Sequence, residues 1–313
     1  MMKFEVTILG CGSATPTLRH GPTSQLLEHD SHLFLIDCGE GTQLQLRRFK
    51  IRFAKINHIF ISHNHGDHCL GLPGLISTLH LLGRNRPLNV YSQEGLREAV
   101  EHQLKISHSR LRFEINWNIL NPEEKSLIFE NKKLQVFSFP LSHRVPCCGF
   151  LFAEKPKSRN IKPECITKYD IPVARIRQIK AGSDYTLKDG TVISNSELTY
   201  RPEPPTSYAF CSDTAYQKRT ADFIQGVNLL YHESTFLEAD IERAQFTFHS
   251  TAKQAAQVAK EANAKKLLLG HYSARYREMQ PFLDEAREHF DHAELADEGM
   301  VVPVKNVEKN SLS

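Results

Sequence analysis

Short hydrophobic segments, each followed by a glycine-containing turn, open the chain. Residues 4–9 and 32–36 have the spacing of buried β-strands, and the turns LGCGS and DCGEGT follow them. Residues 71–82 have the spacing of a helix with a proline near its start, and residues 134–139 have a further strand pattern that ends at a proline. The first half of the chain therefore alternates strands and helices.

The second half repeats this alternation. Residues 207–211, 227–231 and 266–269 are typical of strands. Because strand, helix and strand follow one another in both halves, we predict an α/β fold with mixed sheets covered by helices. The helix between the last two strands is predicted to be capped by Ser250 or Thr251. Its inner face consists of alanines at helical spacing, namely Ala252, Ala255, Ala256, Ala259 and Ala262.

Residues 154–205 differ from both halves. They are rich in lysine, arginine and proline, and they lack a regular apolar spacing. Within them, Asp189 and Gly190 suit a tight hairpin turn. We predict a projecting arm here, and a plain linker is the alternative.

The composition is that of an ordinary soluble globular protein, with 40% hydrophobic and 24% charged residues. The start of the chain lacks the long apolar region of a signal peptide, and no segment has eighteen uninterrupted apolar residues, so export and membrane spanning are not expected. The seven cysteines include no C-x-x-C pair, which is typical of reduced thiols. We therefore predict a cytoplasmic protein.

Positive charge is concentrated in two segments. Between Gly41 and Gly66 there is no acidic residue, and from residue 155 to residue 180 only Glu164 and Asp170 are acidic. Either run alone is compatible with a solvated surface, but together they favour a polyanionic substrate. The first run contains Arg47, Arg48, Lys50, Arg52 and Lys55, and the second contains Lys155, Lys157, Arg159, Lys162, Lys168, Arg175, Arg177 and Lys180.

The segment SHNHGDH, residues 62–68, follows an apolar strand-like run. Its ligand-type side chains are His63, His65, Asp67 and His68. One metal ion needs three or four ligands, so four candidates within six residues suggest two sites. Surface decoration is the alternative, but H-x-H-x-D-H after an apolar strand is a specific pattern.

Three further nitrogen or oxygen ligands follow predicted strands at similar positions. His143 follows FSFPLS, Asp213 follows SYAFCS, and His271 follows KLLLG. Each residue alone is compatible with a surface or capping role. Together with the cluster they predict one shared metal centre, and a donor set of nitrogen and oxygen without thiolate suits zinc or manganese.

These patterns carry a family resemblance. H-x-H-x-D-H with the later ligands resembles the metallo-β-lactamase fold. More narrowly, the chain resembles the ribonuclease Z (tRNase Z) family from about residue 4 to residue 300. The motifs that carry this resemblance are, in order, LGCGSATPT, DCGEGTQ, SHNHGDH, SHR, CSDT, HEST, HST and LGHYSARY. The resemblance implies a four-layer αββα sandwich in a single domain over residues 1–305. It also implies that residues 154–200 are an inserted basic arm that binds tRNA.

The resemblance further implies two zinc ions per chain, with manganese as a possible substitute. Asp213 would bridge the two ions, and Asp37 would hold ligands in orientation. One zinc would take His63, His65 and His143, and the other would take Asp67, His68 and His271.

Three catalytic residues are also implied by the resemblance. Asp67 would accept the proton of the attacking water, His249 would protonate the leaving 3′ oxygen, and Glu233 would hold the ring of His249. From the residues alone, His249 is compatible with a helix-capping surface residue and Glu233 with a solvated carboxylate.

The implied substrate is precursor tRNA, cut after the discriminator base to leave a 3′-hydroxyl on the tRNA and a 5′-phosphate on the trailer. A homodimer is implied as well, and no membrane partner. One departure concerns the arm, where Val173 and Ala174 stand in place of the Gly-Pro motif of many bacterial members. Two other functions remain open, a small-molecule hydrolase on the same fold and a non-enzymatic RNA-binding protein with structural zinc.

Overall fold

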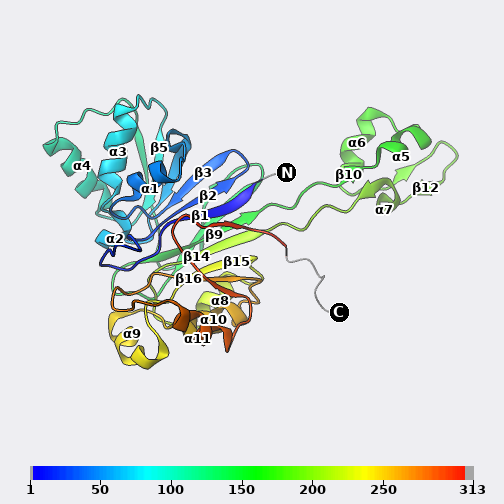
Figure 1. The fold of residues 1–313 in the computed structure, drawn as a ribbon. Helices are drawn as coiled ribbons and strands as arrows, with labels where there is room; N and C mark the ends of the chain where they lie inside the picture. Colours follow the sequence, from blue (N-terminus) through cyan, green and yellow to red (C-terminus); the bar gives the residue numbers. More distant parts are fainter. Residues whose placement is uncertain (1–2, 307–313) are drawn as a thin grey trace. The chain divides into compact units, whose positions relative to one another are not determined.

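The computed structural model describes residues 3–306 and, within them, two seven-stranded sheets (Figure 1). The first sheet has the order β18 (Val301–Pro303), β1 (Phe4–Gly10), β2 (Ser24–His29), β3 (His32–Ile36), β4 (Ile56–Phe60), β5 (Leu88–Ser92) and β6 (Ile115–Ile119). The second has the order β17 (Ala293–Leu295), β16 (Leu267–Gly270), β15 (Leu229–Glu233), β14 (Ser207–Cys211), β9 (Cys148–Glu154), β8 (Leu134–Pro140) and β7 (Ser126–Glu130).

Helices cover the outer face of each sheet, so the predicted αββα order of layers is confirmed (Figure 1). The helices beside the first sheet are α1 (Thr42–Arg48), α2 (Gly66–Cys69), α3 (Leu72–Leu81) and α4 (Leu96–Ile106). Those beside the second sheet are α8 (Arg219–Phe223), α9 (Ile241–Thr247), α10 (Ala252–Glu261) and α11 (Gln280–Arg287), and two short 3-10 turns, Phe53–Lys55 and Glu238–Asp240, complete these layers.

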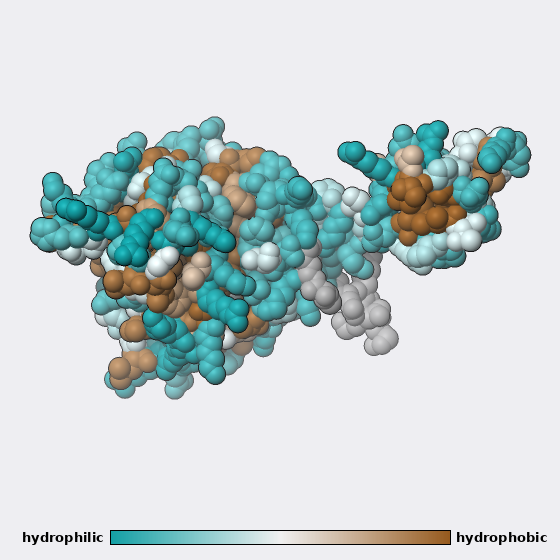
Figure 2. Space-filling view, turned by 90° about the horizontal axis from the view of Figure 1, so that it is seen from above, coloured by the Kyte–Doolittle hydropathy of each residue, from teal (hydrophilic) through white to brown (hydrophobic). Residues whose placement is uncertain are grey.

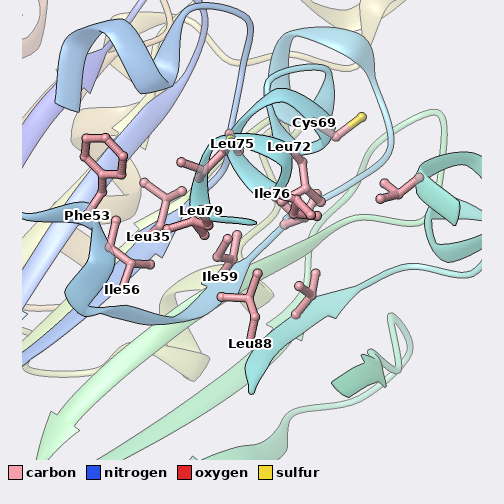
Figure 3. Close-up of a cluster of buried hydrophobic side chains, with 14 of the residues drawn as sticks. Leu35, Phe53, Ile56, Ile59, Cys69, Leu72, Leu75, Ile76, Leu79 and Leu88 are labelled. Carbon is pink, nitrogen blue, oxygen red and sulfur yellow. The ribbon is translucent and has the colours of Figure 1, made fainter. Parts of the chain in front are cut away.

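The alternation of side chains along the strands builds the core. In β3, Leu35 faces the helices and packs in one cluster with Ile59 of β4 and Leu75 of α3 (Figure 3). Its neighbour Phe34 points the other way, and its ring lies 5.8 Å from the ring of Phe152 in the second sheet. Strands that are apolar on both faces therefore pack against a helical layer with one face and against the second sheet with the other.

Most of the predicted elements are present, with small shifts of their ends. Strands β3 and β14 have the predicted bounds, and α10 begins at residue 252 behind a capping box of Thr251 and Gln254, so Thr251 is the cap. The strand predicted at 227–231 lies at 229–233, because Gly226, with φ of 70°, ends a turn there.

A second compact unit comprises residues 130–135 and 153–205, and the predicted arm falls within it. Its elements are β10 (Asn160–Ile161), α5 (Pro163–Lys168), α6 (Val173–Lys180), β11 (Tyr185–Thr186), β12 (Val192–Ile193), α7 (Asn195–Leu198) and β13 (Thr199–Tyr200). It has its own small core of Cys165, Ile171, Ile179, Ile193 and Leu198, and Figure 2 shows hydrophobic residues bordered by hydrophilic ones on one face of this unit. The predicted turn is present, since the Gly190 amide donates to the Leu187 carbonyl between β11 and β12.

Two observations concern the chemistry of the chain as a whole. All seven cysteines are free, in keeping with the predicted reduced thiols, and all seven are buried. Within residues 3–306, no helix has both the length and the apolar character needed to cross a bilayer.

Candidate metal centre

The predicted ligands lie just after the carboxyl ends of strands from both sheets. Strand β4 leads into the segment 62–68, β8 leads to His143, β14 leads to Asp213 and β16 leads to His271. Strands β3, β4 and β5 are parallel, as are β14, β15 and β16, so their carboxyl ends point to common edges. Such an edge is where open α/β sheets place their sites.

A first group of donors consists of His63, His65, His143 and Asp213. Their ligand atoms all lie within 4.8 Å of one another. Nε2 of His63 and Nε2 of His143 lie 3.0 and 3.3 Å from Nδ1 of His65, and Oδ2 of Asp213 lies 3.6 Å from Nε2 of His63. Three imidazoles and one carboxylate therefore converge on one point.

A second group consists of Asp67, His68, Asp213 and His271. Oδ1 of Asp213 lies 3.3 Å from Nε2 of His68 and 3.1 Å from Nε2 of His271, and Oδ2 of Asp67 lies 3.2 Å from Nε2 of His68. Both Nε2 atoms are buried and have no hydrogen-bond partner among the described residues, although carboxylates are close. Buried donors that converge without hydrogen bonding fit a divalent metal ion. Asp213 belongs to both groups.

Asp37 orients His68 directly and His63 through Ser62, by buried hydrogen bonds. Its buried carboxylate accepts hydrogen bonds from the Ser62 amide (2.7 Å), the Ser62 hydroxyl (2.9 Å) and Nδ1 of His68 (2.7 Å). Because the Ser62 hydroxyl donates to Asp37, it accepts from Nδ1 of His63 at 3.0 Å. Both rings are therefore held in the tautomer that leaves the Nε2 lone pair free for a metal.

The other two Nε2 ligands are oriented in the same way. Nδ1 of His143 donates to the Phe248 carbonyl at 3.0 Å, and Nδ1 of His271 lies 2.9 Å from the Thr235 hydroxyl. Phe248 and His271 adopt left-handed backbone conformations, with φ of 60° and 62°. Such conformations cost about 1 kcal/mol or more in a non-glycine residue and tend to occur at functional sites.

The two donor groups differ in charge: the rings of the first group are neutral, whereas carboxylates surround His68 in the second. Burial lowers the pKa of His63, His65 and His143, which keeps these imidazoles in the neutral form that binds metals. Burial also opposes the charged form of His68, but Asp213, followed by Asp67 and Asp37, outweighs burial and raises its pKa. Three carboxylates around one buried ring provide the charge that a bound cation would balance.

His249 and Glu233 form a pair beside the second group. Nδ1 of His249 lies 2.8 Å from Oε1 of Glu233, which also accepts from the Thr214 amide at 3.0 Å. The other oxygen, Oε2, accepts from the amide of Thr235 at 3.0 Å and from its hydroxyl at 2.6 Å. Burial lowers the pKa of His249, but Glu233 outweighs it and raises that pKa to about 9.

Glu233, His249 and His271 also lie close enough together to hold an ion. Their hydrogen bonds argue against this arrangement, because Glu233 already accepts four and Nδ1 of His249 is one of the donors. A ring held this way suits proton transfer better than metal binding.

The centre opens into a cavity of about 380 Å³. Besides the candidate ligands, the lining includes the arginines Arg144, Arg243 and Arg275 and the loop residues 13–15. Cationic side chains around a metal centre suit an anionic ester.

The structure thus brings together every residue that the sequence analysis placed at the site. Their roles as ligands and catalysts stay predictions. Sequence reasoning missed Ser62, Thr235 and Phe248, which orient three of the rings. Ser62 stands next to His63 in the sequence, but no pattern distinguishes the other two.

Comparison with known proteins gives two kinds of match. The model of the anti-Pycsar protein Apyc1 family matches residues 4–160, which include the ligands up to His143 but not Asp213 or His271. Ribonuclease Z of Parabacteroides distasonis is 49% identical over 97% of this chain and 100% of its own length. The chain belongs to the ribonuclease Z family. A second member supports this assignment: ribonuclease Z of Porphyromonas gingivalis is 47% identical over 96% of this chain and 99% of its own length.

Solved structures extend the ribonuclease Z match to three dimensions. The short form of human tRNase Z (ELAC1) has a TM-score of 0.71 and 27% identity, and the match covers 96% of this chain and all of that one. The metallo-β-lactamase fold protein YhfI from Bacillus subtilis shares the fold. It has a TM-score of 0.68 and 18% identity, and the match covers 96% of this chain and 99% of that one. The chain therefore has the metallo-β-lactamase fold.

Proposed function

We propose that this chain removes the 3′ trailer from precursor tRNA, as a metal-dependent endoribonuclease that leaves a 3′-hydroxyl on the tRNA and a 5′-phosphate on the trailer. The observation that carries the proposal is the convergence of seven ligand-type side chains from both sheets in a member of the ribonuclease Z family. Each ligand group suits one ion, and the shared Asp213 suits a bridge between two.

The ions in this proposal are two Zn²⁺, with Mn²⁺ as a possible substitute. One would be held by His63, His65 and His143, the other by Asp67, His68 and His271, and Asp213 would contact both. Bound there, the ions would supply Lewis acidity, which lowers the pKa of a water molecule and offsets the charge of a phosphodiester.

The residues of the chain would handle the protons. Burial raises the pKa of the Asp67 carboxyl, but His68 and His271 outweigh burial and lower it, so Asp67 faces the cavity ionised and able to accept a proton from the attacking water. His249 lines the same cavity with Nδ1 bound to Glu233, which leaves Nε2 to donate a proton to the departing 3′ oxygen.

Exposed basic side chains would bind the RNA backbone. Arg47, Arg48 and Lys50 at the end of α1 are exposed, and so are Arg175 and Arg177 on α6. Lysine and arginine on several elements suit recognition of RNA by its shape and phosphates. Because α6 begins at Val173, where many bacterial relatives would have Gly-Pro, its contacts would differ in detail from theirs.

We also propose a homodimer. Leu44 on α1 and Leu70, Leu81 and Leu82 at the two ends of α3 are all more than half exposed, and a second copy would cover them. Sedimentation of a Leu44→Asp, Leu81→Asp variant tests this, since we expect a monomer, and an unchanged dimer would argue against this face. A cytoplasmic location stays a prediction, in keeping with the free, buried thiols.

The proposed activity is tested by mapping both ends of the cleavage products of a 3′-extended tRNA, with and without chelator. We expect one cut after the discriminator base that chelator abolishes and added zinc restores. Metal-loaded protein that binds this RNA without cutting it would instead favour an RNA-binding protein with structural zinc.

A further inference from the structure

Two exposed phenylalanines are next in the sequence to residues that line the cavity. All 18 phenylalanines of the chain lie within residues 3–306, and Phe246 (79% exposed) and Phe248 (41% exposed) are the two most exposed of them. Leaving a phenyl ring in water forgoes about 2 kcal/mol of burial free energy, so two such rings separated by one residue call for a functional reason.

Their position relative to the centre is fixed. They flank Thr247, which lines the cavity, and Phe248 precedes His249. The left-handed backbone of Phe248 closes helix α9 and directs its carbonyl to Nδ1 of His143. Figure 1 shows α9 apart from α10 and α11 beside the second sheet, and the exposure of Phe246 and Phe248 leaves the end of α9 accessible.

We propose that Phe246 and Phe248 form a stacking platform for the base of the last tRNA nucleotide, on the 5′ side of the scissile bond. This inference rests on the proposed function. Unpaired bases are commonly bound by stacking on aromatic side chains, and the nearby Arg243 and Arg144 supply positive charge for the adjoining phosphates.

The roles of the neighbouring residues select this nucleotide. His249 would protonate the 3′ oxygen that leaves with the tRNA, so we assign the exposed rings next to it in the sequence to the tRNA side of the cut. The proposal therefore separates this nucleotide from the first nucleotide of the trailer.

The test is a cycle of protein and RNA changes, read out as the Kd of a 3′-extended tRNA on metal-loaded protein in which His249→Ala slows cutting. In this background the protein keeps Phe246 or carries Phe246→Ala, and the RNA is intact, abasic at the last tRNA nucleotide, or abasic at the first trailer nucleotide. We expect Phe246→Ala to weaken binding of intact RNA by about tenfold, and to add nothing once the last tRNA base is absent. Additive losses with the last-nucleotide substrate, or a loss shared only with the trailer substrate, would overturn the proposal.

Conservative variants separate stacking from apolar contact. Phe246→Trp is expected to keep the native Kd, whereas Phe246→Leu should behave as Phe246→Ala does. Phe248→Ala should weaken binding by a similar factor. This substitution removes the ring without adding backbone strain, because alanine and phenylalanine are equally disfavoured at φ of 60°. Ile106→Ala, at an exposed apolar residue on α4, is the matched control and should change nothing.

Two further outcomes would count against the platform. If Phe246→Ala alters the oligomeric state in sedimentation, the rings belong to a protein interface. If Phe246→Leu binds as the native protein does, any apolar side chain suffices and stacking is wrong. These readouts measure binding and do not depend on turnover. A protein that binds tRNA but does not cut it would therefore contradict the proposed function without contradicting the stacking platform.

Discussion

The metal centre and the second unit use polar residues in opposite ways. At the centre, His63, His68, Asp213 and His271 are at most 2% exposed, and neighbouring groups fix their orientation. In the second unit, charged side chains stand in solvent around a core of five buried residues. The first arrangement depends on geometry and the second on charge, so single substitutions should affect them very differently.

The sharpest test of this contrast is removal of the shared carboxylate. Asp213→Ala should reduce cleavage of 3′-extended tRNA by about a thousandfold or more, because both donor groups lose a ligand. Metal content by mass spectrometry should fall below two ions per chain. Asp189→Ala, at the exposed hairpin turn of the second unit, is the control and should keep both metals and activity.

Loss of the proton donor should be nearly as severe but leave the metals in place. His249→Ala should slow cleavage of tRNA by about a thousandfold. With bis(p-nitrophenyl) phosphate the loss should be much smaller, because that leaving group needs no proton. Loss of metal in this variant would show that His249 is a ligand.

Shortening the second unit should separate substrates. Asn160 and Tyr200 are partners in the β10–β13 pair, so an Asn-Gly turn can replace residues 161–199. We expect tRNA cleavage to fall about a hundredfold as the phosphate contacts disappear. Hydrolysis of the small ester should stay within about twofold. Equal losses on both substrates would contradict the division of labour, and unchanged tRNA cleavage would show that the second unit does not bind the substrate.

A milder change at the centre tests orientation rather than ligation. Asp37→Asn keeps the shape of the side chain but weakens its hold on Ser62 and His68. Metal affinity should fall by about 10- to 100-fold, measured by competition with a chelator dye. An unchanged affinity would mean that the buried strand ends alone hold the rings.

The smallest effect is expected for charge on α6. Arg175→Gln with Arg177→Gln should lower tRNA affinity by about tenfold and reduce the slope of log Kd against log salt by about one to two. Neutralising Lys260 and Lys265 around the end of α10 is the control, and an equal effect there would mean that only net charge matters.

The local density of ligands explains what could be predicted. His63, His65, Asp67 and His68 lie within six residues after an apolar strand, and this pattern alone predicts a metal centre. His143, Asp213 and His271 became candidates because each follows a strand, and the family resemblance joined them into two groups.

Tertiary contacts explain what could not. Thr235 reaches His271 across 36 positions, and Phe248 reaches His143 across 105, so no local pattern contains either contact. In the fold, α5 and α6 were missed because they are short helices of six and eight residues, and their stability comes from the small core around Ile179.

Donors from the two sheets meet at one point, and this has a consequence for the integrity of the whole fold. His63 and His68 follow a strand of one sheet, whereas Asp213 and His271 follow strands of the other. Cations bound between them would link the two sheets and stabilise the folded protein. The melting temperature of the protein should therefore rise with the free zinc concentration. A cell short of zinc would then hold a protein that is both idle and more readily degraded.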